Sequence, residues 1–147
     1  MTISVRALEP EDRERWQQLY AGYGDFYQKP LSDEKADLVF GWLLDPTHES
    51  NALVAFDDDL LVAIGHYREF SRPLAGGRGL YLDDLFTDPD ARGAGAGTAI
   101  IEALKVIAQE RGLGLVRWIT ATDNYTAQHI YDKLATRTLW VTYDLEL

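Results

Sequence analysis

The stretch that decides the fold spans residues 92–98 and reads Arg92-Gly93-Ala94-Gly95-Ala96-Gly97-Thr98. It follows an apolar run at residues 79–87, which predicts a buried strand, and it precedes a helical repeat of apolar residues that ends at Gly112. The three glycines let the backbone bend tightly and approach a ligand without Cβ clashes. The free N–H groups at a helix start carry partial positive charge, so this turn suits a phosphate or diphosphate, to which Arg92 and Thr98 add a charge and a hydroxyl.

Other interpretations of this turn are open from its residues alone. A dinucleotide-binding fold would carry Gly-x-Gly-x-x-Gly after an early strand, whereas the spacing here is Gly-x-Gly-x-Gly and the turn lies late in the chain. No Gly-Lys-Ser/Thr follows, which disfavours a P-loop. A strand–helix connector that binds no ligand is the remaining alternative, because short glycine motifs discriminate poorly.

Hydrophobic periodicity on both sides of the turn predicts one mixed α/β domain that spans residues 1–147. The predicted order is β-α-α-β-β-β-α-β-α-β, with helices on both faces of the sheet. Strands are expected at residues 3–8, 52–56, 60–70, 79–87, 115–121 and 139–145. Helices are expected to begin near Pro10, Ser32, Gly97 and Ala127. The first helix is expected to break at residues 22–24, and residues 71–78 are expected to form a loop.

Composition and charge limit the classes of function. Apolar residues make up 46% and charged residues 26% of the 147 residues, the balance of a globular protein with a packed core. The chain has no cysteine, which excludes disulfide frameworks, thiolate–zinc sites and a cysteine nucleophile, and an intracellular, cytoplasmic protein is expected. The net charge of −10 disfavours nucleic acid and anionic membranes as partners, and it favours a small cationic amine or a basic peptide. His48, His66 and His129 show no metal-ligand spacing, so no metal site is predicted and these histidines are interpreted as structural or surface residues.

Three motifs, in order along nearly the whole chain, resemble the GCN5-related N-acetyltransferase (GNAT) superfamily. Arg92, Gly95 and Gly97 match its diphosphate motif, Arg/Gln-x-x-Gly-x-Gly/Ala, between the fourth strand and the third helix. Residues 124–131 resemble the family's Asn-x-x-Ala-x-x-x-Tyr. Residues 80–86 resemble the Tyr-Leu-Glu-Asp-Leu/Phe-Phe block of the branch that holds the spermidine/spermine, thialysine and yeast histone/polyamine-type acetyltransferases, with Asp83 in place of the usual Glu.

The resemblance implies the GNAT acyl-CoA N-acyltransferase fold, with fourth and fifth strands that splay apart, and acetyl-CoA (coenzyme A) as the acyl donor. Tyr131 would be the general acid that protonates the departing thiolate, although core packing alone also explains a tyrosine in its apolar stripe. Branch members are commonly homodimers, which suggests a homodimer here. The residues implied in cofactor binding are Leu85, Phe86, Thr87, Arg92, Gly93, Ala94, Gly95, Ala96, Gly97, Thr98, Asn124 and Tyr131.

Amine chemistry supplies a role for Asp83. At pH 7 only about one molecule in a few thousand of an alkylamine with a pKa near 10.4 is neutral, so a base is needed. Asp83 is the candidate base, acting directly or through a water. Successive strand residues face opposite ways, so only one of Asp83 and Asp84 is expected to line the cleft, and Asp84 is expected to cap or pair structurally. Tyr23, Asp25 and Tyr27 are candidates for an acceptor pocket that attracts an alkylammonium group, with a packed interhelical turn as the alternative.

These inferences predict an N-acetyltransferase that moves acetyl from acetyl-CoA to a primary amine, such as a polyamine-like, lysine-like or other small alkylamine. A protein lysine acetyltransferase of the histone type and an aminoglycoside acetyltransferase remain open. The rival from another class is a catalytically silent acyl-CoA-binding sensor or scaffold, which would not need Asp83 or Tyr131. A nucleotide-binding regulatory domain is a third hypothesis.

Overall fold

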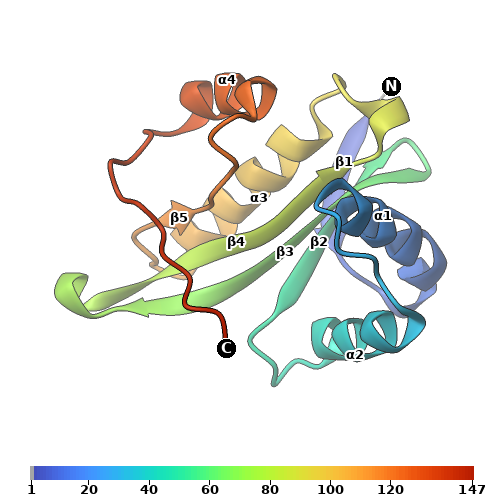
Figure 1. Cartoon of the computed structure of the whole chain (residues 1–147), viewed down its shortest axis with the longest axis horizontal. Coiled ribbons are helices and arrows are strands. Elements are labelled where there is room, and N and C mark those ends of the chain that lie inside the picture. Colours follow the sequence, from blue (N-terminus) through green and yellow to red (C-terminus); the bar gives the residue numbers. More distant parts are fainter. Residues whose placement is uncertain (1) are drawn as a thin grey trace.

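A computed structural model describes residues 2–147 and places five strands in one sheet with the order β1-β2-β3-β4-β5 (Figure 1). Neighbouring strands run antiparallel from β1 to β4, whereas β5 runs parallel to β4. The strands are β1 (Ile3–Ala7), β2 (Asn51–Asp57), β3 (Leu60–Arg72), β4 (Gly77–Thr87) and β5 (Val116–Arg117). The α-helices are α1 (Arg13–Phe26), α2 (Asp33–Leu44), α3 (Ala96–Glu110) and α4 (Tyr125–Leu134), and three short 3-10 helices are η1 (Pro10–Asp12), η2 (Pro73–Ala75) and η3 (Pro89–Ala91).

Two hydrophobic cores lie on the two faces of this sheet and confirm the predicted mixed α/β architecture. One core packs α3 against the sheet, with Leu80, Ile100 and Leu104 fully buried. The other packs α1 and α2 against the opposite face, around Trp16 and Ile64. Among the described residues no helix is long and apolar enough to cross a membrane.

Strands β4 and β5 separate soon after they meet, which confirms the predicted splay. Their pairing is limited to Leu80 with Val116 and Tyr81 with Arg117. Beyond Tyr81, β4 continues to Thr87 while it pairs only with β3 on its other side. Half of the backbone N–H and C=O groups of this part of β4 therefore point into the gap between the two strands.

Two predicted breaks between elements are absent. Helix α1 continues through residues 22–24, because the two glycines there provide close packing: a Cβ on Gly22 would lie 3.0 Å from the Phe86 ring, and a Cβ on Gly24 would lie 2.5 Å from the Lys29 carbonyl oxygen. The predicted loop at residues 71–78 is the tip of a long β3–β4 hairpin, in which Arg72 pairs with Gly77 around η2.

The predicted strands at residues 115–121 and 139–145 are the main errors. The first is reduced to the two residues of β5, because β4 diverges from it. The second does not form: residues 136–147 have no regular structure, and the chain runs past the β3–β4 hairpin in Figure 1 without pairing with the sheet.

Candidate active site

The glycine-rich turn forms an open backbone cradle at the start of α3. Gly93 and Gly95 adopt left-handed φ values of +92° and +86°, and a Cβ on either would meet no atom within 4 Å. Gly95 is the N-cap of α3 but supplies no side-chain cap, and the first backbone hydrogen bond of the helix runs from the Ala99 N–H to the Gly95 carbonyl. The backbone N–H groups of the first turn are therefore free to donate hydrogen bonds to a bound anion. No acidic residue occupies that turn. This geometry fits the predicted diphosphate site.

Arg92 lies at the entrance to the cradle, with its guanidinium carbon 5.6 Å from the centre of the Phe86 ring. Both residues line a hollow of about 480 Å³ between α1 and the end of β4. Thr87 lies under the turn, where its Oγ1 would be 3.5 Å from a Cβ on Gly97. The predicted residues of β4 and of the turn are thus gathered at one end of the β4–β5 gap.

A β-bulge at Asp83 reverses one prediction. In the β3–β4 pairing His66 lies opposite Asp84 and Tyr67 lies opposite Leu82, so Asp83 is an extra residue on β4. The extra residue interrupts the alternation of side chains, and both carboxylates lie on the face of the sheet that α1 covers. The expectation that only one of the two acids can line the cleft is therefore wrong.

Asp84 accepts a converging set of hydrogen bonds in a partly buried position. His66 contacts its Oδ2 through Nδ1 at 2.8 Å, and the Tyr20 hydroxyl donates to the same oxygen at 3.2 Å. Burial alone would raise the pKa of this carboxyl, but the hydrogen bond from His66, with hydrogen bonds from Tyr23 and Tyr20, holds it below its usual value. Asp84 is therefore a carboxylate at neutral pH, and its contacts with His66 and Tyr20 confirm the prediction that it pairs structurally.

A hydrogen bond from Trp16 fixes the orientation of the His66 ring. The indole nitrogen of Trp16 donates to His66 Nε2 at 2.9 Å, and both side chains are buried. Because an indole N–H can only donate, Nε2 accepts and the ring proton is assigned to Nδ1, which donates to Asp84. The chain Trp16–His66–Asp84 thus holds a negative charge in one place. The prediction that His66 is an ordinary structural or surface histidine misses this contact with the site.

Asp83 lies on the more open side of the bulge. Arg68 Nε donates to its two carboxylate oxygens at 3.1 and 3.3 Å, and both side chains are about one-third exposed. Burial raises the pKa of Asp83, with a smaller opposing effect from the Arg68 contact. A raised pKa makes this carboxylate a stronger base than a free aspartate, as the predicted role requires.

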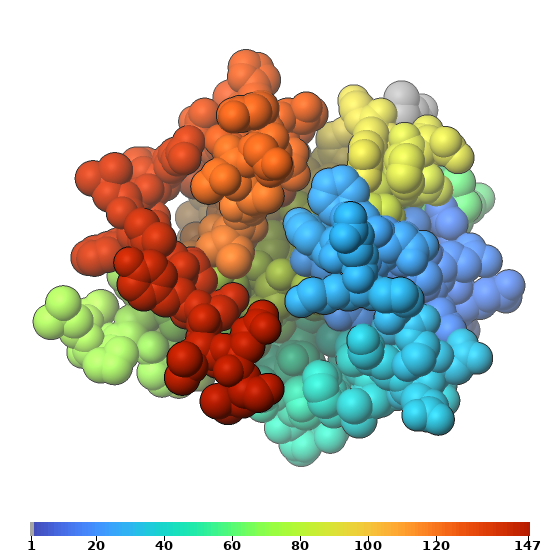
Figure 2. Space-filling view, viewed as in Figure 1, coloured from blue at the N-terminus to red at the C-terminus, as the bar shows by residue number. Residues whose placement is uncertain are grey.

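An aromatic stripe runs along α1 from the site of the carboxylates, where the Tyr20 hydroxyl donates to Asp84. Ring centres lie 5.3 Å apart for Trp16 and Tyr20, 5.9 Å for Tyr20 and Tyr23, and 4.9 Å for Tyr23 and Tyr27. Burial raises the pKa of Tyr131, and a smaller effect from Tyr27 raises it further. The space-filling view shows a hollow between α1–α2 on one side and α4 with the C-terminal segment on the other, with β4 at its floor (Figure 2).

Helix α4 carries the second predicted motif. The Asn124 side chain caps the helix by accepting from the Ala127 N–H at 3.3 Å, and the Tyr131 ring packs edge-on against Trp118, 5.4 Å between centres. Trp118 belongs to the chain that leaves β5. Tyr131 is therefore packed as the alternative interpretation requires, and its role as a general acid stays a prediction.

The structure separates Asp25 from the two tyrosines with which it was predicted to act. Tyr23 and Tyr27 are four residues apart on one side of α1, whereas Asp25 lines the hollow near Arg92 on the other side. Within residues 2–147 no cluster of histidine, aspartate and glutamate residues has the arrangement of a metal site.

Four contributors to the site were missed from the sequence: Trp16, Tyr20, His66 and Arg68. The available signal was weak. His66 stands at the end of the apolar run from Leu60, where a polar residue within a buried strand calls for a partner. Trp16 and Tyr20 are four residues apart on one face of the first predicted helix, but the sequence does not show which strand this face packs against.

Comparison with known proteins agrees with this geometry. The Acetyltransferase (GNAT) family profile matches residues 16–135. The chain belongs to the GNAT acetyltransferase family. It is therefore an acetyl-CoA-dependent acetyltransferase.

Individual relatives of this GNAT protein are also N-acetyltransferases. It is 34% identical over 143 residues to the D-amino-acid N-acetyltransferase HPA3 of Saccharomyces cerevisiae, with 96% of this chain and 89% of the relative covered. It is 32% identical over 63 residues to the thialysine N-epsilon-acetyltransferase of Bos taurus, which covers 43% of this chain and 37% of the relative. The ribosomal-protein-alanine N-acetyltransferase of Brucella melitensis biovar Abortus 2308 shares the fold with a TM-score of 0.83 at 21% identity, over the full length of both chains.

Proposed function

We propose that this GNAT protein acetylates the primary amine of a small molecule at the two carboxylates of the β4 bulge. The observation that carries the proposal is that Asp83 and Asp84 share one face, beneath the tyrosines of α1 and beside the unpaired edge of β4. Two negative charges flanked by aromatic rings suit an alkylammonium group, through Coulomb attraction and cation–π contact. The cleft floor lies between the diphosphate cradle and Tyr131, where an acetyl donor would be presented.

Acetyl-CoA fits the residues present. The free N–H groups of Gly93–Gly97 would hold its diphosphate, and the unpaired backbone of Leu85 and Thr87 would hydrogen-bond its pantetheine arm as an added strand. The family resemblance assigns Asn124, Ala94, Ala96 and Thr98 to the same cofactor, and Arg92 would supply a cation to its diphosphate. When bound, acetyl-CoA supplies the thioester carbonyl that the amine attacks.

The chain's own groups would move the protons. Asp83 takes a proton from the substrate ammonium, directly or through a water, and so leaves a neutral nitrogen to form the new C–N bond. As the C–S bond breaks, Tyr131 donates its phenolic proton to the thiolate. The acylated nitrogen gives up its excess proton to water, and Tyr131 takes a proton back from water, so the amide and the free thiol are the products. The raised pKa of Tyr131 keeps this phenol protonated at neutral pH, as an acid must be. Asp84, held by His66 and Trp16, fixes the ammonium near Asp83.

Arg68 limits the class of amine that is expected to receive the acetyl group. Its recorded hydrogen bonds to Asp83 come from Nε alone, so the two terminal nitrogens are available for an anion beside the amine site. An amino acid carries both an amine and a carboxylate, and a relative that matches 96% of this chain is named for D-amino acids. We therefore place amino-acid-like amines ahead of polyamines, and ahead of basic peptides.

The test is acetyl-CoA turnover against a panel of amines, read by release of free thiol. The chain contains no cysteine, so the protein contributes no background to this readout. The panel should hold D- and L-amino acids, thialysine and lysine, polyamines, an aminoglycoside and a basic peptide. The proposal predicts the highest kcat/KM for amino acids, and a selective loss of this preference in Arg68→Gln. Thiol release that no amine raises above hydrolysis would overturn the amine assignment, and preference for the peptide would overturn the small-molecule assignment.

A further inference from the structure

A row of alternating cationic and aromatic side chains leads along the β3–β4 hairpin away from Asp83. Arg68, which donates to Asp83, has its guanidinium carbon 4.8 Å from the centre of the Tyr81 ring. The Phe70 ring meets Tyr81 edge-on at 5.9 Å between centres, and the guanidinium carbon of Arg117 lies 5.5 Å from the centre of the Phe70 ring. This row of contacts is therefore continuous from the proposed amine site to β5.

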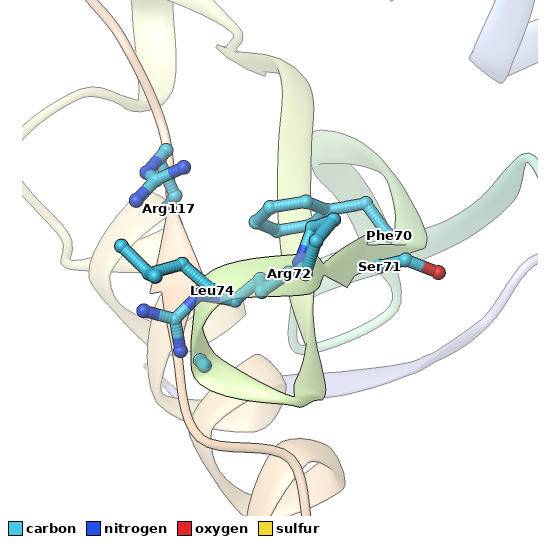
Figure 3. A pocket seen from close by; sticks show the side chains of 7 residues that line it. Phe70, Ser71, Arg72, Leu74 and Arg117 are labelled. Carbon is cyan, nitrogen blue, oxygen red and sulfur yellow. The ribbon is translucent and has the colours of Figure 1, made fainter.

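The row ends in a pocket of about 240 Å³ at the tip of the hairpin. Figure 3 shows Phe70 and Arg72 of the hairpin and Arg117 of β5 around this pocket. Gly79 of β4 leaves room for the first two, since a Cβ there would lie 3.1 Å from Phe70 Cε1 and 3.3 Å from Arg72 Cδ. Packing against the backbone of β4 therefore places the Arg72 side chain at the pocket.

Neither guanidinium group at the pocket has an anionic partner within residues 2–147. Arg72 and Arg117 take part in none of the recorded ion pairs of the described residues, although the net charge of the chain is −10. Arg78, on the opposite face of the same hairpin, is paired with Glu69. An arginine stays protonated in proteins, and its planar fork of donors matches a carboxylate. Two such forks beside an aromatic ring suit the anionic end of a ligand.

The spacing between the two ends of this row sets the length of such a ligand. Arg68 and Arg72 lie four residues apart on one face of β3, and a strand rises about 3.3 Å per residue, so the pocket lies about 13 Å from the bulge. An extended peptide has the same rise, so about four residues span this distance. A single amino acid, with its amine at Asp83 and its carboxylate at Arg68, does not reach the pocket.

We propose that Arg72 and Arg117 form a second acceptor subsite, which binds the C-terminal carboxylate of a short peptide whose α-amino group is acetylated at the β4 bulge. This inference rests on the proposed function, and it extends the class of acceptor to peptides of about four residues without basic side chains. The first peptide carbonyl takes the place of the amino acid's carboxylate beside Arg68. The reaction forms the C–N bond at the α-nitrogen and breaks the C–S bond of acetyl-CoA, so the α-ammonium peptide gives the acetyl-peptide, the CoA thiol and one proton.

The first experiment compares acceptors of different length on the wild-type chain. Thiol release from acetyl-CoA is measured with glycine and its oligomers up to hexaglycine, each as the free acid and as the C-terminal amide. After glycine, whose carboxylate reaches Arg68, the ratio of kcat/KM for acid over amide should rise again near four residues, to about tenfold, because that length places the carboxylate at the two arginines.

The outcomes of this comparison separate the two proposals. A ratio that falls steadily from glycine onward, or that stays near one for tetraglycine, would overturn the subsite while acetylation of glycine leaves the proposed function standing. Thiol release that no amine raises above hydrolysis would overturn both.

Variants then assign the effect to the two arginines. In the double variant Arg72→Gln, Arg117→Gln the acid-to-amide ratio for tetraglycine should fall to near one. The matched control is Arg78→Gln, on the opposite face of the hairpin, which should keep the wild-type ratio. Circular dichroism checks that both proteins retain the fold, and the length comparison needs no variant. A double variant with the wild-type ratio, or an equal loss in the control, would overturn the proposal.

Discussion

The hydrogen bond from Trp16 to His66 makes a measurable prediction for stability. In Trp16→Phe the phenyl ring retains much of the contact with Phe40 and Tyr20, whose ring centres lie 5.0 and 5.3 Å from the indole. It cannot donate, so His66 Nε2 is left without a partner in a buried position. An unsatisfied buried acceptor costs about 1–3 kcal/mol, and we expect the free energy of unfolding to fall by that amount, with a further loss from the smaller ring. At about 2–4 °C per kcal/mol for a chain of this size, Tm should fall by about 2–12 °C.

The assay is urea unfolding followed by far-ultraviolet circular dichroism, because tryptophan fluorescence changes with the substitution itself. The matched control is Trp42→Phe, at a half-exposed tryptophan that stacks on His48, where the loss should stay within about 0.5 kcal/mol. Freed from the indole, His66 can present its other tautomer to Asp84, so kcat/KM should fall as well. A Trp16→Phe protein as stable as the control would show that the Trp16–His66 bond does not hold the site.

Three further predictions concern the cradle, the phenol and the carboxylates. Gly95→Ala and Gly76→Ala both place a Cβ at a left-handed φ in open space, which costs about 1–2 kcal/mol of stability. Only Gly95→Ala should raise KM for acetyl-CoA. Equal KM values for the two variants in steady-state assays would show that the turn does not bind the cofactor. Tyr131→Phe should lower kcat by about 100-fold or more with little change in KM for acetyl-CoA, and unchanged turnover would assign the proton to water. The pKa of Asp84 is lower in the folded chain than in the unfolded chain, where it is about 3.9, so ionised Asp84 stabilises the fold above that pH and this contribution is lost as pH falls through the folded pKa. The urea midpoints at pH 7 and pH 3 should therefore differ more for wild type than for Asp84→Asn. An equal difference would contradict the hydrogen-bond network.

Local sequence signals predicted the parts of the site that depend on the backbone. The glycine-rich turn and the helix start after it follow from residue type and spacing, because a diphosphate cradle needs glycine and a helix start. The central position of Asp83 follows from the apolar run around it. These features are local in the chain, so a single sequence carries them.

Features that depend on pairing between distant residues could not be predicted in this way. The bulge at Asp83 arises from the register of β4 against β3, and alternation of side chains along one strand gives no sign of it. The buried bond between Trp16 and His66 joins residues that are 50 positions apart. The glycines at 22 and 24 suggest a helix break from propensity, whereas the contact with Phe86 and the Lys29 carbonyl explains them. The segment at 139–147 has the pattern of a strand, but it pairs with no strand of the described residues.

The position of a bound amine tests the central claim most directly. In a crystal structure of the protein with CoA and an amine that the panel identifies as a substrate, the amine nitrogen should lie within about 2.6–3.2 Å of a carboxylate oxygen of Asp83 or Asp84, or one water away. The CoA sulfur should lie beside the Tyr131 hydroxyl. An amine bound in the hollow lined by Asp25 and Arg92, with both bulge carboxylates facing only Arg68 and His66, would contradict the account.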